Sequence, residues 1–452
     1  MGEAAVKVSS NQYFDNAPIG KVQKKFLWFA AIAYFFDQMD NNTFSYVAPK
    51  LREVMGLTMK QIGDINALAF LGMFFGAIFG GWLADKIGRK NGLLSCIAIF
   101  SIASIANGLT NNYHMFCVSR FMTGFGVIGM VVIAMVYISE MLPAATRGKY
   151  QALTIAFGTA GIPVCATFAK WVIPQGLDGW RFVFILGGLS ILLIPVGLSW
   201  LKESPRWLVS KGKISEAAKI IEEVVPGRKI ELVVADEKKA GVIDALRVMF
   251  HAAYLKRTIV LFILANGITV AIFLKAAWYP TLLKEFGFTT QLSLMIAAVQ
   301  AYAFPFGDAA TSLISDRGGR KIPIIILALL CAGITLIMAY DMTPWVQMVS
   351  GFAKTMVATG VMTLLWTYLA ESYPTKVRST ATGIMFGSAR LSTSAAMLYI
   401  PALAVAYGIK GIFLLLATLY AVPAILVLFI GESTGKRSLE DINATGEEIL
   451  AR

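Results

Sequence analysis

Seven ionisable side chains lie inside long apolar stretches of the sequence. They are Asp37, Asp40, Arg120, Lys275, Asp308, Lys354 and Arg390. The stretches are about 20 residues long, which is the length that an α-helix needs to cross a ~30 Å hydrocarbon core. A charge at that depth is costly, so each of these side chains is a candidate functional group. A carboxylate there can carry a proton, and a cation can hold an anion.

Asp40 and Arg120 are predicted to lie at the same depth. With a rise of ~1.5 Å per residue, Asp40 is ~12 Å and Arg120 ~10 Å from the same outer boundary, so the two side chains can pair. An arginine neighbour stabilises a charged carboxylate, whereas an apolar setting without it favours the protonated form. We therefore predict that Asp40, or Asp37 on the same segment, forms a proton-coupling site with Arg120. The alternative is a permanent structural ion pair.

The cations in the second half of the chain outnumber their acidic companions. Lys354 and Arg390 are predicted ~15 Å deep, near the midplane, with Lys275 somewhat further out. Asp308 is placed nearer the cytoplasm, and its role is open. A solute carboxylate would supply the missing charge, and Arg390 offers it bidentate geometry. Alternatively, Lys354 and Arg390 pair with the acids of the first half, and the solute is a neutral sugar or polyol.

Two aromatic residues near these charges, Tyr34 and Trp278, are candidates for stacking on a sugar or aromatic ring. Tyrosine and tryptophan near helix ends more often belong to the belt at the membrane surface, which is the alternative interpretation.

No metal, cofactor or enzyme activity is expected. The chain has two histidines, and its four cysteines lie apart inside apolar stretches, so the usual ligand cluster is missing. No phosphate-binding loop for a nucleotide is present, and no cluster of nucleophile and base is found.

The elements that must position these groups are predicted to be membrane helices. Of 452 residues, 57% are hydrophobic and 15% charged, whereas soluble domains carry about 45–50% and about 25%. The fold class is therefore an all-α membrane protein with twelve transmembrane helices. We place them at about 26–48, 62–84, 92–110, 113–138, 150–172, 180–201, 258–281, 291–314, 322–341, 344–370, 380–406 and 411–431.

The net charge is +13, and the distribution of the basic residues along the chain indicates the membrane topology. Most lysines and arginines fall in the two termini, in alternate loops and in the central loop. Because basic residues concentrate on the cytoplasmic side, we expect a multi-pass protein of the cell (inner) membrane with both termini cytoplasmic. The lipid bilayer is then the expected partner, and nucleic acid is not.

Two patterns recur along the chain with the same offset. Asp85, Gly88, Arg89 and Lys90 reappear as Asp316, Gly319, Arg320 and Lys321, and Tyr137, Glu140, Pro143 and Arg147 reappear as Tyr368, Glu371, Pro374 and Arg378. Transporters are often built from such internal repeats. We predict pseudo-symmetric six-helix halves at 1–201 and 257–452. A cytoplasmic loop with short amphipathic helices at 202–256 joins them, and Ser215 is the predicted N-cap of one of these helices.

The pattern of Gly81, Asp85, Gly88, Arg89 and Lys90 resembles the signature loop of the major facilitator superfamily. Further segments resemble its sugar-porter and metabolite:proton symporter branches: 120–126, 137–148, 203–207 and 431–440. The helix at 258–281 lacks the glutamine pair of sugar porters. Asp37 and Asp40 have the spacing of an aspartate motif of aromatic-acid:proton symporters, without its glycine.

The resemblance implies a cytoplasmic gate of charged residues that rearranges as the transporter alternates. The matching positions are Asp85, Arg89, Glu140, Arg147, Asp316, Arg320, Glu371 and Arg378. Glu140 is expected to pair with Arg147, and Glu371 with Arg378. The alternative is that the basic members of the set only anchor helix ends at the membrane surface.

Together these features predict a secondary transporter rather than an enzyme. The expected function is proton-coupled symport of a small organic anion, such as a sugar acid or aromatic acid, by alternating access. A proton-coupled or facilitative transporter of a neutral sugar or polyol is the alternative. A monomer would suffice for either.

Overall fold

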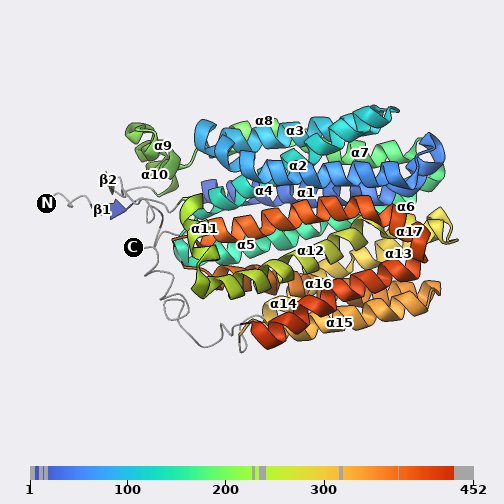
Figure 1. Cartoon of the computed structure of the whole chain (residues 1–452). Helices are drawn as coiled ribbons and strands as arrows, with labels where there is room; N and C mark the ends of the chain where they lie inside the picture. The colour runs from blue at the N-terminus through green and yellow to red at the C-terminus, as the bar shows by residue number, and fades with distance from the viewer. Residues whose placement is uncertain are drawn as a thin grey trace. The chain divides into compact units, whose positions relative to one another are not determined.

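The computed structural model describes residues 6–9, 14, 19–225, 230–233, 241–314, 319–374 and 376–431. These residues are almost entirely helical (Figure 1). In chain order the elements are β1 (Val6–Ser9), α1 (Lys21–Met55), α2 (Met59–Ile87), α3 (Arg89–Leu109), α4 (Tyr113–Met141), α5 (Ala144–Thr159), α6 (Gly161–Val172), η1 (Ile173–Gln175), α7 (Gly179–Gly188), η2 (Leu189–Leu192), α8 (Leu193–Trp200), α9 (Pro205–Ser210), α10 (Ile214–Val224), β2 (Ile230–Val233), α11 (Val242–Phe250), α12 (Ala252–Glu285), α13 (Thr290–Ala301), α14 (Ala303–Ile314), α15 (Lys321–Tyr340), α16 (Pro344–Glu371) and α17 (Arg378–Ile430).

The helices confirm the predicted all-α membrane fold. Within the described ranges, 10 helical stretches are long and apolar enough to cross a membrane. One of them, α17, has 53 residues and breaks at Gly408, where φ is 63°, so it supplies two spans. The 35-residue α1 is less apolar because the polar run from Asp37 to Asn42 interrupts it, and it supplies the remaining span. The total is the predicted twelve.

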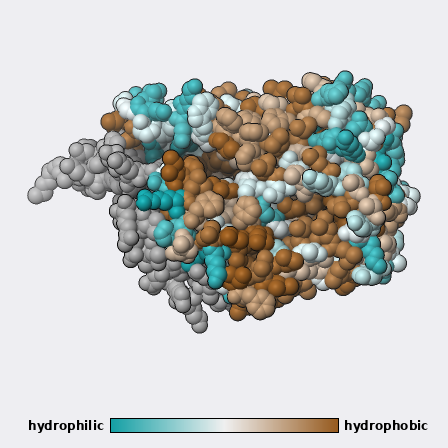
Figure 2. Space-filling view, in the orientation of Figure 1, coloured by the Kyte–Doolittle hydropathy of each residue, from teal (hydrophilic) through white to brown (hydrophobic). Residues whose placement is uncertain are grey.

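The surface between the helix ends is hydrophobic. Figure 2 shows a face that is largely brown, with hydrophilic residues gathered toward the ends of the helices. Large apolar side chains such as Trp345, Val405 and Phe429 are more than two-thirds exposed. Apolar surface on this scale would be unstable in water and fits contact with lipid chains.

Packing divides the chain into two units. Unit 1 comprises Met1–Asn41, Leu71–Gly161 and Arg181–Glu237, and unit 2 comprises Asn42–Phe70, Ile162–Trp180 and Lys238–Arg452. The second part of α1, the first part of α2 and nearly all of α6 thus belong with the C-terminal part of the chain. These units are not the sequence halves, and the boundaries 1–201, 202–256 and 257–452 stay a prediction.

Unit 1 has an apolar core that includes the short helices of the central loop. Aromatic and aliphatic residues of α1, α3 and α4 form it, among them Phe26, Phe100 and Tyr137. Leu208 of α9 and Ala217 of α10 pack onto the same cluster, so each of these short helices has an apolar side against the core of unit 1.

Two local predictions about the loop need correction or addition. Helix α10 begins at Ile214 after Lys213, so Ser215 lies inside the first turn and is not the N-cap. The sequence analysis also did not foresee the short parallel pairing of β1 with β2.

Candidate functional site

The predicted pairing of Asp40 with Arg120 is confirmed within unit 1. Asp40 lies on α1 with 0% of its surface exposed, and Arg120 lies on α4 with 3% exposed. The arginine Nη1 is 3.6 Å from the aspartate Oδ2, which makes an ion pair sealed from solvent. Because neither charge is hydrated, any change in the charge of one is felt strongly by the other.

The second oxygen of Asp40 is held by a residue that the sequence analysis missed. Ser104 on α3 donates a hydrogen bond from its Oγ to Oδ1 of Asp40. The same oxygen lies close to Gly187 on α7, where an added Cβ would be only 2.8 Å away. A serine inside an apolar helix gives little signal in a sequence, since serines often bond only to their own helix backbone.

Asp37 lies three residues before Asp40 on α1 and is also buried, with 1% exposed. Its Oδ2 accepts a hydrogen bond from Gln38 Nε2 at 2.7 Å. Tyr34, one turn earlier, packs against α5, where an added Cβ on Gly158 would collide with the tyrosine ring. Both aspartates are therefore buried in unit 1, and Asp40 pairs with Arg120 at 3.6 Å.

In unit 2 each of the three predicted cations lies over an aromatic ring. Lys275 Nζ is 4.5 Å from the ring centroid of Tyr279, and Lys354 Nζ is 5.0 Å from that of Tyr420. The guanidinium carbon of Arg390 is 4.2 Å from the ring centroid of Phe273. Cation–π contacts of this kind offset part of the cost of burying a cation without supplying a negative charge.

Lys275 also has two neutral oxygen partners. Its Nζ donates to Gln300 Oε1, and Thr355 Oγ1 lies 3.4 Å away. Lys354 lies on α16 next to Thr355 in the chain, with 2% of its surface exposed. No carboxylate contacts Lys275 or Lys354 within the part of the chain that the structure describes.

The other predicted residues of unit 2 are Trp278 and Asp308. Trp278 is fully buried, and its Nε1 has no hydrogen-bond partner among the described residues. In this conformation Trp278 therefore presents no surface to a solute. Asp308 lies half-buried on α14.

The expected charge network at the ends of α2, α3 and α4 is present, with a different pairing from the expected one. Arg89 binds Glu140 through Nε and Nη2, each at 3.1 Å, and binds Asp85 Oδ1 at 2.7 Å. The expected partner of Glu140, Arg147, instead lies in α5, and its Nε has no partner in the described ranges. The two bonds from Arg89 to Glu140 have the bidentate geometry that makes arginine–carboxylate pairs strong. The side chain of Asp85 is 74% exposed and remains accessible to a second partner.

Glu203, three residues after the end of α8, also belongs to this charge network. Its Oε1 accepts hydrogen bonds from the backbone N–H groups of Arg89, Lys90 and Ser204 at 2.7, 3.2 and 2.9 Å. Burial raises the pKa of Glu203, although these N–H groups oppose the shift. An added Cβ on Gly88 would be 2.1 Å from Glu203, so the glycine makes room for the carboxylate.

The second copy of the motif repeats the main bond of the first. Arg320 Nε lies 3.1 Å from Glu371 Oε1, the same distance as between Arg89 and Glu140. Arg378 donates from Nε to the backbone oxygen of Tyr373 at 3.4 Å, and its pairing with Glu371 stays a prediction. Asp316 lies outside the described residues.

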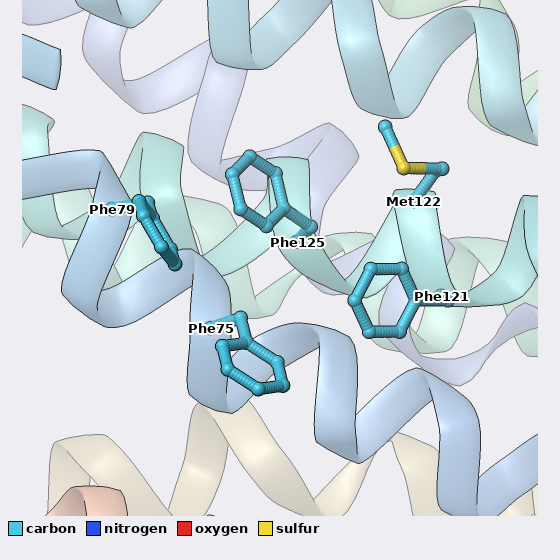
Figure 3. Close-up of a pocket in the computed structure, with 5 residues that line it drawn as sticks. All are labelled: Phe75, Phe79, Phe121, Met122 and Phe125. Carbon is cyan, nitrogen blue, oxygen red and sulfur yellow. The ribbon is translucent and has the colours of Figure 1, made fainter.

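A pocket on unit 1 differs in character from both charged groups. It has a volume of about 330 Å³ and lies between α2 and α4, lined by Phe75, Phe79, Phe121, Met122 and Phe125 (Figure 3). All five side chains are apolar, so the pocket offers no group for a proton or a carboxylate. The candidate site for a charged solute is therefore the cation group of unit 2.

Comparisons with known proteins agree with this architecture. The pattern of the family described as "Sugar (and other) transporter" matches residues 17–445. The chain is 34% identical to the putative metabolite transport protein YyaJ of Bacillus subtilis, over 94% of this chain and 96% of that protein. It is 27% identical to the niacin transporter NiaP of Acinetobacter baylyi, over 95% of this chain and 98% of that protein.

Solved structures show the same fold. The xylose transporter XylE of E. coli, in a partially occluded inward-open conformation, matches with a TM-score of 0.74 at 18% identity, over 92% of this chain and 99% of that chain. The match to the family pattern covers nearly the whole sequence. The chain is therefore a multi-pass membrane transporter, not an enzyme, and belongs to the sugar (and other) transporter family of the major facilitator superfamily.

Proposed function

We propose that this protein is a proton-coupled symporter of a small organic anion, such as a sugar acid, an aromatic acid or a related carboxylate. It works by alternating access in the cell inner membrane, with both termini in the cytoplasm. The observation that carries the proposal is the surplus of positive charge in unit 2. Lys275 and Lys354 are contacted there by aromatic, amide and hydroxyl groups and, among the described residues, by no carboxylate.

A solute carboxylate supplies the charge that this group lacks. Buried charges are normally paired or solvated, because an isolated ion in an apolar interior is unfavourable by many kcal/mol. The cation–π contacts of Lys275 and Lys354 compensate only in part, by about 0.5–2 kcal/mol each. Arg390 adds a planar fork that binds a carboxylate with two parallel hydrogen bonds.

Asp40 is the proposed carrier of the proton. When it is charged, Asp40 attracts Arg120 at 3.6 Å and ties α1 to α4. Protonation removes that attraction, so the two helices can separate and Arg120 can take another partner. Proton uptake is thereby linked to a rearrangement of unit 1, and the direction of the proton gradient sets the direction of the cycle. The charge network around Arg89 is the proposed cytoplasmic gate.

The names of relatives support an anionic solute. Besides the niacin transporter, the 4-hydroxybenzoate transporter PcaK of Acinetobacter baylyi is 29% identical over 83% of this chain. Niacin and 4-hydroxybenzoate are both aromatic carboxylic acids. A neutral sugar is the second candidate, because one of the matching solved structures is a D-xylose-proton symporter.

Uptake into proteoliposomes tests the proposal. Purified protein is supplied with benzoate, gluconate and glucose, with and without an inward proton gradient. We expect gradient-driven uptake of an acid, with KM raised at least tenfold in Lys354→Ala and in Arg390→Ala. Lys410→Ala is the matched control, because Lys410 also lies over a tyrosine ring, that of Tyr340 at 4.0 Å, but is exposed. Uptake of glucose alone, at the same KM in all variants, would contradict anion transport.

A further inference from the structure

A polar chain that runs from backbone carbonyls to Lys275 fixes the orientation of Gln300. The chain begins at Gln347 in the first turn of α16, whose Nε2 donates to the carbonyl oxygens of Met338 and Asp341 at 2.8 and 2.7 Å. Because carbonyls only accept, the amide nitrogen of Gln347 must face them, and its Oε1 must point the other way. That Oε1 accepts from the hydroxyl of Tyr279 at 2.8 Å.

The orientation of the Gln347 amide in turn determines that of the Gln300 amide. Gln300 lies on α13 with 3% of its surface exposed. Since the Tyr279 hydroxyl donates to Gln347, it accepts from Gln300 Nε2 at 3.0 Å. The same Nε2 donates to the backbone oxygen of Gln347 at 2.8 Å, so both amide hydrogens are used. Gly351 leaves the space, because an added Cβ there would lie 1.9 Å from Gln300 Nε2. The Oε1 of Gln300 is thus directed at Lys275.

Lys275 is therefore held in place without being neutralised. The Thr355 hydroxyl donates to the backbone oxygen of Gly351 at 2.7 Å, so it too acts as a neutral acceptor toward Lys275. An ammonium group has three donors, and Gln300 and Thr355 take two of them. The third donor and the full positive charge remain for a solute, and Lys275 is partly exposed.

We infer that Gln300 determines the charge selectivity of the solute site. An amide at position 300 fixes Lys275 without neutralising it, so the positive charge of Lys275 is available to the solute. A carboxylate of the same shape would neutralise that charge instead. This inference rests on the proposed transport of an anion and extends it to a residue without charge of its own. Gln300 acts through Lys275 and is thus a positioning residue.

Acid-to-neutral selectivity tests the inference in the full-length protein. Proteoliposome uptake is measured for benzoate against its neutral isostere benzamide, and for gluconate against glucose. Gln300→Glu is expected to lower the ratio of acid to neutral uptake at least tenfold, mainly by raising KM for the acid with a smaller change in kcat.

Glutamate at position 300 cannot donate the hydrogen bond to the backbone oxygen of Gln347, so Gln300→Glu could also disturb folding. A second pair of variants, at Thr355, tests the inference without changing position 300. Thr355→Asp brings a carboxylate to Lys275 from α16, and Thr355→Asn is its neutral isostere. The ratio should fall at least tenfold in Thr355→Asp and stay within threefold of wild type in Thr355→Asn, with thermal unfolding followed in parallel.

The outcomes separate the two proposals. If wild type prefers the acid and both carboxylate variants keep that preference, the role of Gln300 is wrong while anion transport stands. If wild type prefers the neutral partner of both pairs, anion transport itself is wrong.

Discussion

At the scale of single residues, the ion pair of Asp40 and Arg120 gives Asp40 a charged partner on another helix. Asp37 and Asp40 are both buried, and Asp40 has Arg120 at 3.6 Å and a hydroxyl from Ser104 on its other oxygen. Asp37 accepts from the amide of Gln38 next to it. A site whose charge state controls a contact between helices needs an opposite charge on another helix, and Asp40 meets this condition.

Asp40→Asn is expected to abolish accumulation of the solute against its gradient while exchange of solute across the membrane continues. The amide cannot take up or release a proton, but solute binding in unit 2 is untouched. Asp37→Asn, the matched control on the same helix, should keep gradient-driven accumulation. Uptake and counterflow in proteoliposomes at several pH values measure both. Accumulation that survives Asp40→Asn but disappears in Asp37→Asn would assign the proton to Asp37.

Charged residues could be predicted from the sequence, but their neutral partners could not. The cost of a charge in the membrane marks Asp40, Arg120 and Lys275 as candidates, and helix rise gives their depth. Ser104 and Gln300 have no such cost, because a hydroxyl or amide is satisfied by many partners. Which partner it meets depends on tertiary packing.

At the scale of helices, α2 and α4 approach closely along a row of glycines. An added Cβ would lie 2.1 Å from Phe121 O at Gly72, 2.2 Å from Phe125 O at Gly76, and 2.6 Å from Gly129 Cα at Gly80. The rings of Phe75 and Phe121 meet beside this contact at 6.2 Å between centroids. Backbone-to-backbone packing of this kind is a major source of helix association in membranes.

Gly76→Ala is expected to destabilise the protein by about 1–3 kcal/mol, because the added methyl group must push α4 away. Gly81→Ala is the control on the same helix, since a Cβ there meets nothing within 4 Å. It should be neutral or slightly stabilising, by at most about 1 kcal/mol, because alanine favours the helix. Thermal unfolding in detergent compares the two. Equal melting temperatures for both variants would show that the α2–α4 contact is loose.

The helices themselves were predicted from the sequence, and the breaks inside them were not. A run of about 20 apolar residues is sufficient to identify a span. Within such runs, however, α5 gives way to α6 near Ala160, and α13 to α14 at Tyr302. Each break lies three residues before a proline, Pro163 or Pro305, that the predicted spans did not treat as an interruption. In α17 the positive φ of Gly408 separates two spans that stay helical on either side.

At the scale of the whole molecule, the second part of α1 belongs to the same packing unit as α12. Ser45 donates to the backbone oxygen of Ala276, and Arg52 pairs with Glu285. Glu53 pairs with Lys284 and also with Lys50, at 3.1 Å for the latter. Ser45 and Ala276, and likewise Glu53 and Lys284, are 231 residues apart, which is the offset between the two copies of the sequence motifs, so these contacts join equivalent positions of the two repeats.

The end of α1 that carries these ion pairs faces outward if the termini are cytoplasmic, as proposed, so alternating access requires the pairs to break. Glu53→Gln should therefore favour the state in which this end is open. A cysteine at Val47, which is fully buried, reports the opening in a background without the four native cysteines. We expect Val47→Cys to react faster with a membrane-impermeant maleimide when combined with Glu53→Gln. Glu216→Gln, which removes an exposed ion pair on α10, is the control.

The pH dependence of this reaction follows from the pKa of Glu53. Partial burial raises that pKa, but the hydrogen bonds and charges of Lys284 and Lys50 outweigh burial and leave it below its ordinary value of 4.5. A lowered pKa means that the contribution of Glu53 to the closed state is complete above the ordinary value and is lost as pH falls through the lowered one. Because maleimide reacts with the thiolate, each labelling rate is divided by the rate of the unfolded protein at the same pH. This ratio for Val47→Cys should be low at neutral pH and rise only at acid pH. With Glu53→Gln this rise should be absent, whereas the same rise in both proteins would place the acid-sensitive contact elsewhere.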